Sequence, residues 1–125
     1  MVKTIISIIL VGIMLIVGAI YEHTFVNKQF DDFHQVLTTL YHKIDDESAV
    51  RDDVLAVQKS WLEKKKSLHV FIPHNDIKEV DLWLSEAVTL VDDKEWKDAI
   101  SKIEVLLELA EQIPKTFNLS FENIL

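Results

Sequence analysis

The chain has 125 residues, of which 49% are hydrophobic, and it carries a net charge of −8 with no cysteine. The absence of cysteine excludes disulfides, thiolate metal sites and cysteine nucleophiles. All 21 acidic residues and all but one of the 13 basic residues follow Tyr21, so the later part of the chain is strongly acidic. Because such a surface repels nucleic acid and anionic lipid headgroups, we expect neither as a partner.

The stretch Thr4–Ile20 contains no charged residue and no proline. As a helix it would span about 26 Å, close to the hydrocarbon thickness of a bilayer. We therefore predict a membrane anchor over residues 1–21, in contact with the lipid bilayer, and one domain over residues 22–125. Lys3 precedes the span and Glu22 follows it, which favours a cytoplasmic N-terminus and an extracytoplasmic domain at the cell membrane.

A cleaved signal peptide is the main alternative to this anchor. Val17, Gly18 and Ala19 are residues that suit cleavage after Ala19. The apolar run is long for a signal peptide, which favours a retained signal-anchor. A buried core helix is disfavoured because the run is apolar on every face.

The remainder of the chain has the apolar spacing of amphipathic helices, and no strand-like alternation persists. The first predicted helix covers Phe25–Ile44 and has no breaker between it and the apolar run. Its predicted apolar face consists of Val26, Phe30, Phe33, Leu37, Leu40 and Ile44. The second covers residues 48–70, after a polar turn and before Pro73. Apolar residues three and four positions apart indicate that both helices pack in a bundle.

Two capping boxes predict where the next helices begin. Asp76 with Glu79 predicts the start of a third helix, and Asp92 with Glu95 the start of a fourth. We expect the fourth helix to end at Pro114. Short connections favour antiparallel neighbours, so the predicted fold is all-α, with an N-terminal transmembrane helix followed by an antiparallel up-down four-helix bundle.

The tail, residues 115–125, is too apolar for a free solvated end. We expect it either to fold back onto the bundle or to meet a partner. Its apolar residues are Phe117, Leu119, Phe121, Ile124 and Leu125.

Several short motifs resemble an uncharacterised bacterial family. They are Trp61 with Lys64 and Lys65, the stretch Val-Phe-Ile-Pro-His at 70–74 before an acidic helix start, and the closing Glu-Asn-Ile-Leu at 122–125. Members of that family are short membrane-anchored proteins of spore-forming Firmicutes, catalogued as a domain of unknown function. The resemblance implies an N-terminal anchor, a helical extracytoplasmic domain, and genes that neighbour those of YetF-like multi-pass membrane proteins.

No catalytic, cofactor or metal signature stands out in the chain. The five histidines lack the spacing typical of zinc sites, and the adjacent carboxylates at 52–53 and 92–93 lie near helix starts, where they favour the helix dipole. We therefore expect no cofactor and no enzymatic activity. The residues that we predict for an interaction or ligand surface are Trp61, His69, His74, Trp83, Phe117 and Phe121.

Two functions from different classes follow. The first is a non-enzymatic accessory or scaffold subunit for another membrane protein, whose partner is a multi-pass membrane protein or a second copy of the chain. Since only residues 1–3 precede the span, any signal to the cytoplasm would pass through such a partner. The alternative is an extracytoplasmic ligand- or metal-binding sensor module, with a site between helices lined by His69, His74 and His42.

Overall fold

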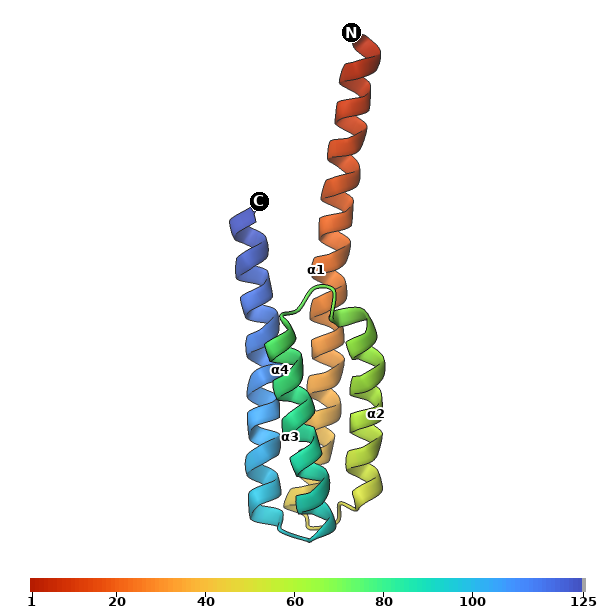
Figure 1. Cartoon of the computed structure of the whole chain (residues 1–125). Helices are drawn as coiled ribbons and strands as arrows, with labels where there is room; N and C mark the ends of the chain where they lie inside the picture. The colour runs from red at the N-terminus through yellow and green to blue at the C-terminus, as the bar shows by residue number, and fades with distance from the viewer. Residues whose placement is uncertain (125) are drawn as a thin grey trace.

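The computed structural model describes residues 1–124, except for the side chains of Phe121 and Ile124. Within this range lie four helices, α1 (Val2–Asp45), α2 (Arg51–Leu68), α3 (His74–Asp92) and α4 (Trp96–Ile124). Consecutive helices run antiparallel, and α4 returns to pack against α1 (Figure 1). The predicted all-α fold with an up-down four-helix bundle is therefore confirmed.

Helix α1 is at once the apolar segment and the first helix of the bundle. It runs unbroken over 44 residues, about 66 Å, and its N-terminal half projects beyond the other helices (Figure 1). This half is long and apolar enough to cross a membrane. In the C-terminal half the buried residues are those of the predicted apolar face: Val26, Phe30, Phe33, Leu37, Leu40 and Ile44.

Trp61 of α2 occupies the middle of the core. It is 1% exposed, and its ring centroid lies 4.9 Å from that of Phe33 and 6.2 Å from that of Phe30. One continuous cluster of buried apolar residues joins the four helices. The bundle therefore has a single core, which begins at Val26, six residues after the apolar run ends.

The predicted start of α2 was three residues early. Helix α2 begins at Arg51, after Glu47 has turned the chain in the left-handed conformation with φ of 57°. The Asp53 carboxylate accepts a hydrogen bond from the Val50 backbone N–H at 2.9 Å, which satisfies a donor at the helix start. Helix α2 also ends earlier than predicted, at Leu68.

Neither predicted capping box forms. Helix α3 begins at His74, directly after Pro73, whose φ of −54° suits a helix start, so Asp76 lies within the first turn. Asp92 is the last residue of α3, and the chain turns at Lys94, with φ of 58°, before α4 begins at Trp96. The Glu95 N–H donates to the Leu90 carbonyl at 2.9 Å, so Glu95 takes part in the turn that ends α3. The prediction had assigned Asp92 and Glu95 to the start of α4.

The predicted end of the fourth helix at Pro114 was also wrong. Pro114 lies inside α4, which continues to Ile124. Proline removes the hydrogen bond to the carbonyl four residues earlier and its ring crowds that carbonyl, but tertiary contacts can compensate for this cost. Beyond the proline, Phe117 packs against the core and Asn118 bonds to Asn27 of α1, so the tail continues as helix along α1.

Candidate interaction surface at one end of the bundle

Apolar side chains gather at the end of the bundle from which the apolar half of α1 projects. The connection between α2 and α3, residues 69–73, closes this end (Figure 1). Its Phe71 ring meets Phe25 of α1 edge-on at 6.2 Å, and Phe25 in turn stacks on Tyr21 at 6.2 Å. Val70, beside Phe71, is 71% exposed. The connection is therefore fixed to α1 by aromatic contacts and presents an apolar tip.

The last turns of α4 complete this end. Phe117 lies with Phe71, Ile72 and Pro73 around a small cavity of about 120 Å³. Leu119, two residues further on, is 61% exposed. We call Phe25, Val70, Phe71, Phe117 and Leu119 the upper rim, after its position in Figure 1.

Two polar contacts fix how far α4 extends along α1. Asn27 and Asn118 exchange side-chain hydrogen bonds of 2.9 and 3.2 Å. Seven residues further along α1, and seven earlier in α4, His34 lies 3.3 Å from Glu111. Because both contacts have the same antiparallel register, the end of α4 at Ile124 is level with Tyr21, where the apolar run of α1 ends.

Trp61 belongs to the core rather than to the predicted surface. Its indole N–H donates to Asp81 Oδ1 of α3 at 2.8 Å, and Lys65 Nζ donates to Asp81 Oδ2 at 2.8 Å. Trp61 and Lys65 are one helical turn apart, so both face the same carboxylate. The Trp-Lys motif of the sequence thus joins α2 to α3.

The predicted histidine set does not come together. His69 and His74 flank the connection at the upper rim, and both are exposed. His42 lies near the far end of α1, separated from His69 by the whole of α2, 18 residues or about 27 Å. Across the residues that the structure describes, no three His, Asp or Glu side chains lie close enough to hold a metal ion.

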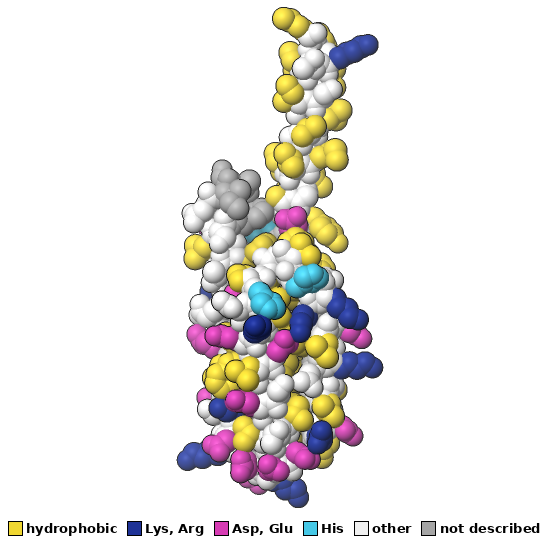
Figure 2. Space-filling model, in the orientation of Figure 1, with side chains coloured by type: hydrophobic (Ala, Val, Ile, Leu, Met, Phe, Trp, Pro, Cys, Tyr) yellow, Lys and Arg dark blue, Asp and Glu magenta, His cyan; other side chains and the backbone are white. Residues whose placement is uncertain are grey.

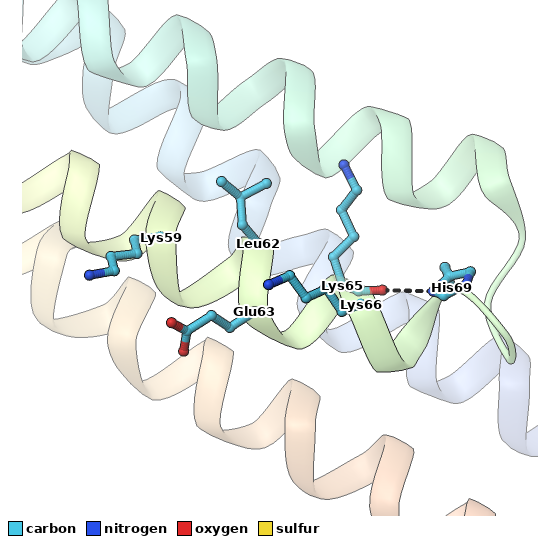
Figure 3. A pocket seen from close by; sticks show the side chains of 6 residues that line it. All are labelled: Lys59, Leu62, Glu63, Lys65, Lys66 and His69. Atoms are coloured by element: carbon cyan, nitrogen blue, oxygen red, sulfur yellow. Dashed lines mark hydrogen bonds between the residues drawn. The ribbon is translucent and has the colours of Figure 1, made fainter.

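The outer face of α2 beside the rim is basic. Lys59, Lys65, Lys66 and His69 lie around a shallow hollow with Leu62 and Glu63 (Figure 3). Lys65 and Leu62 point toward α3, and the His69 ring lies 3.3 Å from the carbonyl of Lys65 (Figure 3). Since α2 and the residue that follows it, His69, supply every side chain, the hollow is a surface for contact rather than an enclosed pocket.

Trp83 lies away from the rim, nine residues into α3, or about 14 Å from His74. It is half-buried, and the Lys102 ammonium of α4 lies 4.6 Å from its ring centroid. Lys102 also pairs with Glu86 at 3.3 Å. The predicted surface is therefore divided, with Phe117, His69 and His74 at the rim and Trp83 on the α3–α4 face; the Phe121 side chain lies outside the described residues.

Comparison with known proteins identifies the family. A family model described as a domain of unknown function, DUF4363, matches residues 20–124. The chain belongs to the DUF4363 family. No curated protein and no solved structure matched. The matched DUF4363 region begins where the apolar run of α1 ends, so it comprises the bundle and the full length of α4.

Sequence reasoning missed the polar residues that join the helices of this DUF4363 domain. The role of Asp81 could have been predicted, because a buried tryptophan requires an acceptor for its N–H and an acidic residue on the next helix can provide it. The roles of Asn27, Asn118, His34 and Glu111 could not, since their pairing depends on the register between the first and last helices.

Proposed function

We propose that this DUF4363 protein is a membrane-anchored, extracytoplasmic and non-enzymatic subunit that supports another membrane protein. One observation carries the proposal: the large hydrophobic residues from Ile5 to Ile20 are 51% to 73% exposed, on all sides of a single helix. Figure 2 shows this half of α1 covered by hydrophobic side chains, whereas charged side chains cover the bundle. Such a surface requires apolar surroundings, which a bilayer provides.

The continuity of α1 supports a scaffolding role. Because no turn separates the apolar half from the core half, the bundle is held at a fixed position along the helix that anchors it. A partner in the same membrane would therefore meet the bundle at a defined height. The resemblance described above implies that this partner is a multi-pass membrane protein; the alternative is a second copy of the chain.

The positions of the acidic residues support a non-enzymatic role. Asp53 bonds to the Val50 N–H and lies 3.1 Å from Lys43 Nζ, and both contacts hold the pKa of this carboxyl below its ordinary value. Asp92 pairs with Arg51 at 3.5 Å. Both carboxylates therefore serve at helix ends, Asp53 in the first turn of α2 and Asp92 at the last residue of α3.

Crosslinking in intact cells of the native host tests the proposal. A photoreactive residue would replace Leu82, which is exposed on α3, or Ile13 in the apolar half of α1. We expect affinity purification and mass spectrometry to recover a stoichiometric multi-pass membrane protein, or a second copy, with at least one variant. The matched control, made with the photoreactive residue at Leu82, replaces residues 1–19 with a cleavable signal peptide, which should release the bundle and abolish the crosslink. Recovery of the intact full-length chain alone from both variants would refute the proposal.

The orientation and retention of the anchor need a separate test. The chain has no cysteine, so a Ser101→Cys variant offers one thiol, at an exposed position of α4. A membrane-impermeant maleimide should label this variant in intact cells, because the bundle lies outside. Protection until lysis would reverse the orientation, and a mature chain beginning at Ile20 would show that the anchor is removed.

A polar groove between α1 and α4 supports the alternative, a ligand-binding sensor module. It is lined by Asn27, Asp31 and His34 from α1 and by Glu111, Lys115 and Asn118 from α4. Thermal melts with small polar molecules and divalent cations would test it, because a ligand at 100 times its Kd adds about 2.7 kcal/mol to stability. Melts that do not shift with any of them would count against a sensor.

A further inference from the structure

The end of α4 extends past the bundle toward the level at which the apolar half of α1 begins. Figure 1 shows α4 continuing beyond the α2–α3 connection, alongside α1. The register set by the Asn27–Asn118 pair makes Asn123 level with Glu22 and Leu119 level with Val26. At about 1.5 Å per residue, Asn123 is about 3 Å and Leu119 about 9 Å below Ile20 along the helix axis.

The connection between α2 and α3 reaches a similar level. Phe71 contacts Phe25, which is five residues, or about 8 Å, from Ile20. The headgroup layer on each side of a bilayer is about 5–8 Å thick, because the hydrocarbon core is about 30 Å and the whole membrane about 40–45 Å. If Ile20 marks the edge of the hydrocarbon, the upper rim lies within or just beneath the headgroups.

The residues at this level suit such an environment. Residues 69–73 and 116–121 contain no Asp, Glu, Lys or Arg, in a chain whose charged fraction is 27%. The acidic residues next to them, Glu22 of α1 and Glu122 of α4, are both exposed. Val70 and Leu119 are exposed, and the aromatic residues Tyr21, Phe25 and Phe71 lie beside them. Aromatic and apolar groups favour the interface between membrane and water.

We propose that the end of α4 and the α2–α3 connection rest in the headgroup layer of the bilayer that α1 enters, as a second membrane contact. This inference rests on the proposed function, because it requires α1 to be a membrane anchor. The lipid surface is the occupant that the observations favour, since the rim is continuous with the apolar half of α1 and level with its end. A single helix lets the bundle tilt relative to the membrane plane, whereas further contacts beside α1 limit that tilt and hold the bundle upright next to a partner.

Depth-dependent quenching tests the second contact on the full-length chain in phosphatidylcholine vesicles. An environment-sensitive fluorophore is attached to one cysteine in each of three variants: Ile20→Cys in α1, Asn123→Cys at the end of α4, and Ser101→Cys at the far end of α4. A nitroxide carried on the lipid headgroup is the quencher. All three positions are exposed, so none disturbs the core.

We expect the label on the Asn123→Cys variant to be quenched at least half as strongly as that on Ile20→Cys, and the label on Ser101→Cys to remain unquenched. If the label on Ile20→Cys were quenched and the label on Asn123→Cys were not, the second contact would be overturned and the anchor would stand. Absence of quenching at both positions would overturn the anchor itself, and with it the proposed function.

A second pair of substitutions tests whether the apolar rim makes the contact. Leu119→Glu, combined with the label on Asn123→Cys, should reduce quenching at least twofold, because it removes an exposed apolar side chain from the contact and adds a second carboxylate three residues from Glu122. Leu82→Glu is the matched control, since Leu82 is 54% exposed and lies away from the rim on α3. Equal quenching in the two variants would contradict a role for the rim.

Discussion

The two halves of α1 have the same backbone but opposite patterns of burial. Residues 5–20 are apolar on all sides and exposed, whereas residues 26–44 are apolar on one face, which is buried. The glycines show the same contrast. Both of them, Gly12 and Gly18, lie in the first half, and a Cβ added at either would meet nothing within 4 Å.

The comparison shows how the distribution of apolar residues around a helix selects its surroundings. A narrow apolar face requires a protein neighbour on one side, and three helices provide it for residues 26–44. An apolar surface on every side requires an apolar medium. The transition takes place between Ile20 and Val26, where Glu22 is the first acidic residue of the chain.

The sharpest test places the same substitution in each half. Val26→Asp puts an unpaired carboxylate at a position that is 0% exposed, and we expect it to lower the free energy of unfolding by about 5 kcal/mol. Val11→Asp lies near the middle of the apolar run at a position that is 57% exposed, and it should leave the bundle unchanged but weaken membrane insertion by about 3 kcal/mol. Denaturant unfolding in detergent measures the first effect, and membrane fractionation measures the second. Equal losses of unfolding free energy in both variants would remove the distinction between the halves.

The next largest effect tests the neighbour of the buried half. Trp61→Ala removes the ring that packs on Phe30 and Phe33 and leaves Asp81 without its indole donor, so we expect a loss of about 4 kcal/mol. Trp83→Ala is the control, because Trp83 is half-buried and should lose about 1 kcal/mol. Urea unfolding of the two variants should give clearly separate midpoints. Similar midpoints would mean that the core does not depend on Trp61.

The core of this fold could be read from the sequence because it repeats along each helix. The apolar face of the first helix was predicted residue by residue, since spacings of three and four positions define one side of a helix. Helix ends were harder to predict. Glu47 and Lys94 turn the chain in the left-handed conformation that glycine usually provides, so no glycine marks the ends of α1 and α3.

The candidate surface was only partly predictable, because it depends on contacts between helices far apart in the sequence. His69, His74 and Phe117 were selected as single residues, and the structure places all three at one end. Trp61 was misplaced, since its N–H is satisfied by Asp81 twenty residues away. Phe25 and Phe71 were missed because their contact joins α1 to the α2–α3 connection.

A substitution with a smaller expected effect tests the contact between the end of α1 and the start of α2. Asp53→Ala removes the hydrogen bond to Val50 and the ion pair with Lys43, so we expect about 1 kcal/mol less stability at pH 7. Because these contacts lower the pKa of Asp53 in the folded state, its contribution is present above about pH 4 and is lost as the pH falls further. The difference from the unsubstituted chain should therefore shrink as the pH falls below about 4 in acid unfolding curves. A constant difference across this range would exclude the carboxylate as its cause, and Asp52→Ala at the exposed neighbour is the control.

The smallest effect concerns the end of the buried half. Glu47 follows the last residues of α1 with φ of 57°, which is unfavourable for a residue with a Cβ. Glu47→Gly removes this cost at the price of some added freedom in the unfolded chain, and we expect a net gain of about 0.5 kcal/mol, or about 2–4 °C in Tm. Gln35→Gly, at an exposed position inside α1, should instead lose about 1 kcal/mol, because glycine has no conformational advantage within a helix. Changes in Tm of opposite sign in the two variants would establish that the backbone at Glu47 is strained at the end of α1. A lower Tm in both variants would show that it is not.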